Sequence, residues 1–259
     1  MRILSLHRYP VKGFSPEPLE AVTLVAGRYM PGDRLYAVEN GPAGFDPAEP
    51  RWLPKIKFLM LMRNGSLARI RTRYDDATAT LTAALDGRSV AADLATPEGR
   101  LAFEAFLRLV VPGELRGPPK VLPAPEGYRF TDSRKGFVSL INAASVRELE
   151  AWAGRPVDPL RFRGNLLVEG LEPFAEFDLV GRELAGPDGI RLRVTSRIVR
   201  CAATNVDPTT GERDLDLPRL LQARLGHADC GVYAEVLAGG TVRVGDDIEP
   251  ARPELDLGS

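Results

Sequence analysis

Turn-forming residues interrupt this sequence about every ten residues, and this spacing limits the structures that the chain can form. Gly, Pro, Asn or Asp separates short runs that are rich in β-branched and aromatic residues. Short strands at such spacing are typical of β-barrels and β-sandwiches. We therefore expect strands in the first part of the chain at residues 3–9, 22–25, 35–38, 58–62, 67–72 and 89–94.

Helical periodicity is confined to a few segments. Thr96 and the Pro that follows it form a favourable helix start, and apolar residues then keep helical spacing as far as a Pro-Gly pair at 112–113. Asn142 can cap a second helix, which Gly154 ends. A third helix is expected from the leucines within residues 217–225.

The second half of the chain also contains strand patterns. Residues 165–168 form a short apolar run, and apolar residues alternate over 190–198 with arginines on the opposite face. Residues 232–237 and 241–244 are expected to form a hairpin around Gly239-Gly240. The predicted fold class is α+β, with strands in the majority.

The segment richest in Pro and Gly, residues 112–125, predicts a boundary between two domains. We therefore divide the chain into an N-terminal β-barrel-like domain with a linking helix, residues 1–110, and a second barrel-like domain with a few helices, residues 111–259. Ligand-binding residues from both halves would then meet between the domains.

Charge and cysteine content exclude several classes of function. The 34 basic and 35 acidic residues give a net charge of −1, which lacks the basic excess of a general nucleic-acid-binding protein. The apolar runs are too short to span a bilayer, so neither nucleic acid nor a membrane is an expected partner. Residues 1–10 resemble a strand rather than a secretory signal, and two cysteines cannot build a disulfide scaffold. We expect a reducing, cytoplasmic location.

The sequence also lacks the motifs of common redox cofactors. Cys201, Cys230, His7 and His227 are too few to hold an iron–sulfur cluster. Neither a Gly-rich dinucleotide fingerprint nor a phosphate-binding Walker loop is present in the sequence. Any redox chemistry would therefore need electrons from elsewhere.

Cys201 is the cysteine placed most favourably for chemistry. It lies at the end of the alternating strand pattern and directly follows Arg200, whose positive charge favours the thiolate. A thiolate is the ligand that soft and transition metals prefer. Two alternatives stay open: a buried cysteine that acts as a small apolar residue, and a nucleophile that uses His227 as its base.

Several basic residues lie in predicted turns beside small residues. Lys12, Arg34, Arg51 and Arg163 are each close to Gly or Pro in the sequence. Basic side chains on rigid turns commonly bind phosphate, and arginine can do so with two parallel hydrogen bonds. The alternative is that each is an ordinary solvated surface charge.

Several ordered segments carry a family pattern. The most specific is RCAATNVDPTTG at residues 200–211; YPVK at 9–12, GDRLYAV at 32–38 and GTVRVGD at 240–246 are weaker individually. Together they resemble the MOSC-domain proteins, named for the C-terminal domain of molybdenum-cofactor sulfurase. In that family an N-terminal MOSC β-barrel domain commonly precedes the MOSC domain, and the resemblance covers nearly the whole chain.

The resemblance implies a binding site for the molybdenum cofactor (molybdenum–molybdopterin). It implies that Cys201 is the metal ligand, and that Lys12, Arg34 and Arg163 hold the phosphate and pterin of the cofactor. The remaining implied site residues are Asp207, as a catalytic residue, and the cofactor contacts Arg51, Asp132, Ser145, Arg200, Thr204 and Asn205.

The resemblance is strongest to the mitochondrial amidoxime-reducing component and to bacterial hydroxylaminopurine-reducing proteins. It implies an oxidoreductase that reduces N-hydroxylated small molecules, such as amidoximes, hydroxylamines and hydroxylaminopurine-like bases. Electrons would come from a separate protein, either a ferredoxin or a cytochrome with its flavoprotein reductase. Two alternatives remain: a cofactor carrier or sulfur-transfer protein that uses Cys201, and a binding module in which this cysteine is inert.

Overall fold

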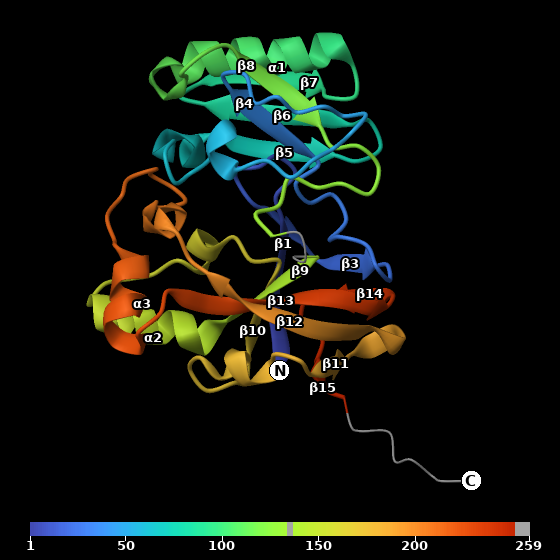
Figure 1. Cartoon of the computed structure of the whole chain (residues 1–259), viewed down its shortest axis with the longest axis vertical. Helices are drawn as coiled ribbons and strands as arrows, with labels where there is room; N and C mark the ends of the chain where they lie inside the picture. Colours follow the sequence, from blue (N-terminus) through green and yellow to red (C-terminus); the bar gives the residue numbers. More distant parts are fainter. Residues whose placement is uncertain (134–136, 252–259) are drawn as a thin grey trace.

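The computed structural model describes residues 1–133 and 137–251 (Figure 1). Its described α-helices are α1 (Pro97–Val110), α2 (Ala143–Ala153) and α3 (Leu217–Leu225). Its strands are β1 (Arg2–Arg8), β2 (Glu17–Leu19), β3 (Ala21–Leu24), β4 (Tyr36–Asn40), β5 (Arg71–Asp75), β6 (Thr80–Leu85), β7 (Arg88–Asp93), β8 (Pro119–Pro123), β9 (Val138–Asn142), β10 (Leu166–Glu169), β11 (Glu183–Ala185), β12 (Arg191–Val199), β13 (Asp229–Ala238), β14 (Gly240–Arg243) and β15 (Glu249–Pro250). The predicted α+β class with a majority of strands is confirmed.

The largest sheet brings together the two ends of the described chain. Its strand order is β15-β11-β12-β13-β9-β10-β1-β2, with β9 and β10 parallel and the other neighbours antiparallel. Alternating residues of β12, including Leu192 and Val194, are buried in the core beneath it, whereas Arg191 and Arg193 are exposed on the other face. In the sequence, β1 and β2 precede residue 110, whereas the other strands of this sheet follow it. The division at that residue stays a prediction.

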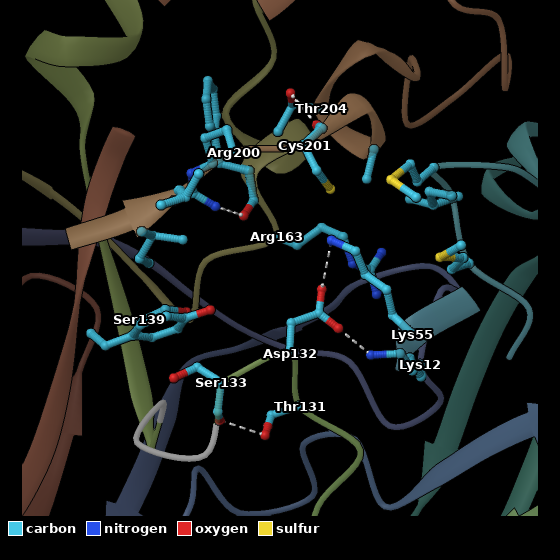
Figure 2. A pocket seen from close by; sticks show the side chains of 18 of the residues that line it. Lys12, Lys55, Thr131, Asp132, Ser133, Ser139, Arg163, Arg200, Cys201 and Thr204 are labelled. Carbon is cyan, nitrogen blue, oxygen red and sulfur yellow. Dashed lines mark hydrogen bonds and ion pairs between the residues drawn. The ribbon is translucent and has the colours of Figure 1, made fainter. Parts of the chain in front are cut away.

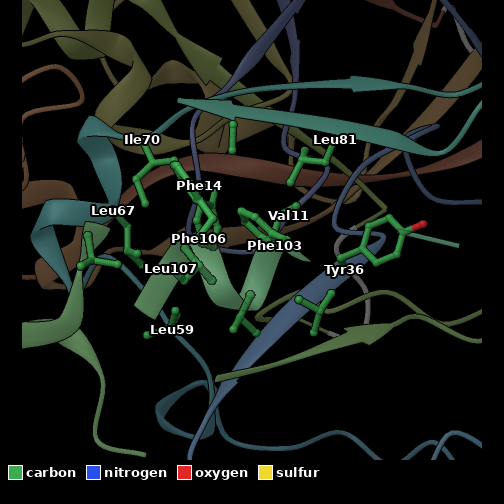
Figure 3. Packing of buried hydrophobic residues seen from close by; sticks show 14 of the residues in the cluster. Val11, Phe14, Tyr36, Leu59, Leu67, Ile70, Leu81, Phe103, Phe106 and Leu107 are labelled. Carbon is green, nitrogen blue, oxygen red and sulfur yellow. The ribbon is translucent and has the colours of Figure 1, made fainter. Parts of the chain in front are cut away.

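A second module lies at one end of the molecule, where α1 covers a small β-structure (Figure 1). It consists of the sheet β5-β6-β7 and the pair β4-β8. The apolar face of α1 supplies Phe103, Phe106 and Leu107 to its core, where they join Phe14 from the loop after β1 (Figure 3). Leu101 and Leu109 lie on the opposite face of α1 and are each 58% exposed.

The predicted helix ends agree with the observed capping. Thr96 Oγ1 accepts a hydrogen bond from the amide of Gly99 at the start of α1. Asn142 Oδ1 accepts one from the amide of Ala144 at the start of α2, and Gly154 ends this helix in a left-handed conformation. These caps satisfy amide groups that have no partner within the helix.

Two of the expected strands are wrong. Residues 58–62 form a largely buried irregular segment with a single bridge at Phe58. The first half of 67–72 belongs to a 3₁₀ helix (Gly65–Arg69), and only its last two residues are in β5. The side chain of Asn64 stabilises this irregular conformation, because its Oδ1 accepts a hydrogen bond from the amide of Met60. A side chain here replaces the partner strand that an apolar run would otherwise need.

The expected terminal hairpin is also wrong. β14 does not pair with β13 but crosses to β3, with Val242 opposite Val22. Gly239 lies between β13 and β14, and a Cβ added there would lie 2.8 Å from the carbonyl oxygen of Leu24 in β3. This close approach to the backbone near β3 requires a residue without a side chain. Along the described residues, no helix is long and apolar enough to cross a membrane.

Phe103→Ala is expected to lower the free energy of unfolding by about 3–5 kcal/mol. Phe103 is completely buried, and its ring centroid lies 5.6 Å from that of Phe14. The matched control on the same helix is Leu101→Ala, which should change the free energy by less than about 0.5 kcal/mol. Urea unfolding followed by circular dichroism measures both, and equal losses would contradict the packing described.

Candidate functional site

A cavity of about 400 Å³ opens where the end of β12 faces the loop after β1 and the irregular segment that follows Pro54. Its lining is strongly basic. Within the described part of the chain, Asp132 is the carboxylate that lines it, and the basic lining residues are Lys12, Arg34, Lys55, Arg161, Arg163, Arg197 and Arg200. Figure 2 shows the side chains of Lys12, Lys55, Arg163 and Arg200 together with Cys201 around a common space. This excess of positive charge favours an anionic ligand.

Cys201 directs its sulfur into this cavity from the end of β12 (Figure 2). It is half-buried and forms no disulfide. Its carbonyl oxygen accepts hydrogen bonds from the amide and the Oγ1 of Thr204, each at 3.0 Å. The next part of the loop is fixed by Arg213, which donates to the carbonyl oxygens of Ala202 at 3.0 Å and Leu61 at 2.6 Å. The cysteine therefore lies on a loop tied to the opposite wall.

Arg163 is held at the cavity wall by backbone and aromatic contacts. Its Nη1 donates to the carbonyl oxygen of Phe14 at 2.7 Å, and its guanidinium lies 4.2 Å from the centre of the Tyr9 ring. Arg34 approaches the same ring to 5.0 Å and forms an ion pair with Asp33. Burial, with Arg34 nearby, lowers the pKa of Arg163 to about 10 despite the favourable effect of Tyr9. Arg163 is still charged at neutral pH, so an anion in the cavity would be stabilised.

Three cavity-lining arginines have a buried nitrogen without a hydrogen-bond partner among the described residues: Nη2 of Arg163, Nη2 of Arg200 and Nε of Arg161. The rest of the Arg200 guanidinium is well held, with Nε donating to the carbonyl oxygen of Cys230 at 2.6 Å and Nη1 to that of Phe162 at 2.8 Å. An unpaired buried donor is costly. Acceptor oxygens of a ligand would remove this cost.

Lys12 and Asp132 form an ion pair at the cavity, in which the side chain of Lys12 is buried and that of Asp132 is half-exposed. Lys12 Nζ donates to Asp132 Oδ1 at 2.5 Å and to the carbonyl oxygen of Phe130 at 3.0 Å. Burial alone would raise the pKa of Asp132, but the ammonium groups of Lys12 and then Lys55 lower it to about 2. The carboxylate is therefore ionised at any physiological pH.

The structure does not bring every implied site residue into the cavity. Arg51 is a surface residue paired with Glu49 at 3.1 Å, and its side chain is 81% exposed. Ser145 is completely buried and donates to Glu176 Oε2 at 2.8 Å. In these positions both have structural contacts rather than access to a ligand.

Asp207 and Asn205 likewise stabilise the loop around the cysteine. Asp207 Oδ1 accepts from the amides of Thr209 and Thr210, while its Oδ2 accepts from Arg161 at 3.0 Å. Asn205 Oδ1 accepts from the amide of Leu217 at 3.0 Å. Neither lines the cavity, so the catalytic role expected for Asp207 stays a prediction that its position does not support.

The cavity also contains residues that the sequence did not identify, among them Lys55, Ser139, Arg161 and Tyr233. Lys55 follows Pro54 in the same segment as Arg51, and of these two basic residues Lys55 is the one that lines the cavity. Tyr233 lies in the segment 232–237, which the sequence identified only as a strand. Across the described residues, no group of three or more His, Cys, Asp or Glu could hold a metal ion.

Comparison with known proteins gives two family matches that together cover most of the chain. Residues 1–107 match the MOSC N-terminal beta barrel domain, and residues 127–249 match the MOSC domain. The molybdenum cofactor sulfurases of Caenorhabditis elegans and Caenorhabditis briggsae are 39% and 38% identical over 99 residues, which is 36% of this chain. The matched region spans only 13% of the length of each of these relatives.

Two solved structures are also similar. The YuaD protein from Bacillus subtilis aligns with 12% identity and a TM-score of 0.46, covering 95% of this chain and 93% of its own. YiiM from Geobacillus stearothermophilus aligns with 12% identity and a TM-score of 0.38, covering 73% and 76%.

Asp132→Asn is expected to lower the free energy of unfolding by about 1 kcal/mol near pH 7, because it leaves the buried ammonium of Lys12 without a carboxylate. The expected loss is small because the side chain of Asp132 is 47% exposed, so water screens its charge. Since the pKa of Asp132 is lowered on folding to about 2, its contribution is complete above about pH 4 and is lost as the pH falls toward 2.

Urea unfolding at several pH values measures this difference between the variant and the wild type. Glu49→Gln is the matched control, because this carboxylate is also paired with a basic residue but lies on the surface. It should change the free energy by less than about 0.5 kcal/mol at every pH. A constant deficit of Asp132→Asn across the pH range would contradict the role assigned to its charge.

Proposed function

The chain belongs to the MOSC family, with an N-terminal MOSC β-barrel domain before its MOSC domain, and from this we propose that it is a molybdenum-cofactor oxidoreductase acting on N-hydroxylated small molecules. The observation that carries the proposal is the combination of one accessible thiol, Cys201, with a basic cavity whose buried arginines have unpaired donors. The curated relatives are named for the same cofactor.

The residues present fit such a group. The cofactor has an anionic phosphate, which Lys12, Arg34 and Arg163 would hold, and a soft metal, which the thiolate of Cys201 would bind. Cys230 cannot take this role, because burial raises the pKa of its thiol to about 12. When bound, the cofactor supplies a redox-active molybdenum centre for two-electron chemistry.

The proposed reaction is R–NH–OH + 2H⁺ + 2e⁻ → R–NH₂ + H₂O. The N–O bond breaks, nitrogen is reduced, and the oxygen leaves as water. Around this reaction the chain would bind and orient the reactants, and Phe162 and Met60 add apolar surface to the lining of the cavity. Val199, which is 74% exposed and also lines the cavity, offers an apolar contact for the body of a substrate at the entrance.

Cys201→Ser is expected to abolish stoichiometric molybdenum binding and to reduce turnover of benzamidoxime by at least about 100-fold, because serine does not supply a soft thiolate. Protein made in a host that synthesises the cofactor is analysed for molybdenum, for pterin and for activity with an artificial reductant. Cys230→Ser is the matched control and should keep both metal and activity. Full molybdenum content and turnover in Cys201→Ser would refute the assignment.

We also propose that a separate redox protein, either a ferredoxin or a cytochrome with its flavoprotein reductase, supplies the electrons. The sequence contains no dinucleotide or iron–sulfur motif that could do so. Such docking contacts are commonly small and guided by charge. The free cysteines fit the reducing cytoplasm in which we place this exchange.

Metal-loaded protein should therefore not oxidise NADH or NADPH in the presence of benzamidoxime, but should turn over when reduced methyl viologen is added. Both assays are run on the same preparation, with Cys201→Ser protein as the control for reduction by viologen alone. Rapid NADH-dependent turnover by the isolated chain would contradict this proposal, because it requires a nicotinamide site within the chain.

The sulfurase relatives favour a second candidate, in which Cys201 transfers sulfur or hands over the cofactor without reducing a substrate. The two candidates differ in one measurement. A carrier would bind molybdenum through Cys201 but would not convert benzamidoxime with reduced methyl viologen. The reductase would do both.

A further inference from the structure

Lys55 occupies a place in the cavity that the family pattern did not indicate. It begins a short 3₁₀ helix (Lys55–Lys57) directly after Pro54, and Figure 2 shows its ammonium between Asp132 and Cys201. Its Nζ lies 3.7 Å from Asp132 Oδ2. Burial opposes the charge of Lys55, but Asp132 and, after it, the Cys201 side chain, through a hydrogen bond, raise its pKa. The ammonium is therefore a neighbour of the sulfur.

The charge of Lys55 is only partly balanced. Asp132 already accepts a hydrogen bond at 2.5 Å from Lys12, so Lys55 shares a carboxylate that has a closer partner. By contrast, Arg161 is paired with both Asp207 and Asp214. On the side of Cys201, the neighbour of Lys55 is the thiol, and among the described residues no second carboxylate lines the cavity there. Positive charge thus remains available beside the sulfur.

This position is separate from the basic group around Tyr9. Arg34 and Arg163 contact that ring, and Lys12 is held by Phe130 and Asp132. Lys55 instead belongs to the irregular segment on the opposite wall, and its side chain is 33% exposed. One set of cations can therefore hold a phosphate while Lys55 contacts a second, smaller negative group.

We propose that Lys55 is a positioning residue that holds a negatively charged or strongly polarised oxygen of the substrate beside Cys201. The identity of that oxygen as the one bound to nitrogen rests on the proposed function. The anion-attracting role of Lys55 rests only on the cavity. The ligand class is an oxyanion or an N–O group, rather than an uncharged amine.

A purely structural role for Lys55 is not supported by its contacts. Its 3₁₀ helix contains no buried residue, and Lys57 on the same turn is an exposed lysine. Lys55→Gln should therefore fold normally. Lys57→Gln removes the same charge two residues away and serves as the matched control.

The test uses alkylation of Cys201 in the cofactor-free protein by iodoacetate, which is anionic, and by iodoacetamide, which is neutral. Both reagents react with the thiolate, so the thiolate fraction cancels in the ratio of their rate constants. Cys230 is completely buried, and Cys201→Ser protein gives the background. The ratio therefore reports how strongly the site attracts an anion to the sulfur.

Lys55→Gln should lower the iodoacetate-to-iodoacetamide ratio about fivefold at low salt, which is the effect of one unit charge at about 4 Å in water. Lys55→Arg and Lys57→Gln should keep the wild-type ratio, and about 1 M salt should remove most of the difference. An unchanged ratio in Lys55→Gln, or an equal fall in Lys57→Gln, would overturn the proposal.

A second readout concerns the loaded enzyme. Lys55→Gln should reduce kcat/KM for benzamidoxime about fivefold or more, and Lys55→Arg should restore most of it while molybdenum content stays unchanged. If the ratio of alkylation rates falls but no variant reduces benzamidoxime, the proposed function fails and the anion-attracting role of Lys55 stands. If the enzyme reduces benzamidoxime but Lys55→Gln leaves the ratio of alkylation rates unchanged, the proposed function stands and the anion-attracting role of Lys55 fails.

Discussion

The cavity brings together more positive charge than the protein around it neutralises. Arg34 and Arg163 both lie close to the ring of Tyr9, and a buried guanidinium is costly unless it is paired. Arg34 has Asp33 as its partner, whereas Arg163 has a backbone carbonyl oxygen, that of Phe14, and an unpaired donor. The rest of the site depends on this imbalance, because it makes the empty space suited to an anion and unsuited to an apolar ligand.

Buried polar side chains, some of which also line the cavity, hold the strand ends in place. Asn165 accepts from the amide and hydroxyl of Ser139 and donates to the carbonyl oxygen of His7, so it joins the ends of β1, β9 and β10. Glu176 accepts from Ser145 and from the amide of Gly231. Such satisfied networks give a unique arrangement of strands. They also explain why Ser145, although it lies in a family-like segment, has a structural position.

Local features of the fold could be predicted from the sequence, whereas long-range pairing could not. The caps at Thr96 and Asn142 depend on a few adjacent residues, so the helix starts were found. The pairing of β14 with β3 depends on residues more than two hundred positions apart, and a two-residue glycine turn is compatible with more than one partner. In the site, Cys201 was found by its position at a strand end. Arg51 and Lys55 flank the same proline in a segment without periodicity, so the sequence could not show which of them faces the cavity.

The meeting of the chain's two ends in one sheet has a consequence for biosynthesis. The amide of Ile3 donates to the carbonyl oxygen of Asp246, and β1 pairs with β10, so β1 cannot complete its contacts until residue 246 has left the ribosome. Contacts of such long sequence separation form slowly. The walls of the cavity, from Lys12 to Tyr233, are therefore completed late, and any ligand enters a finished protein rather than assisting the growing chain.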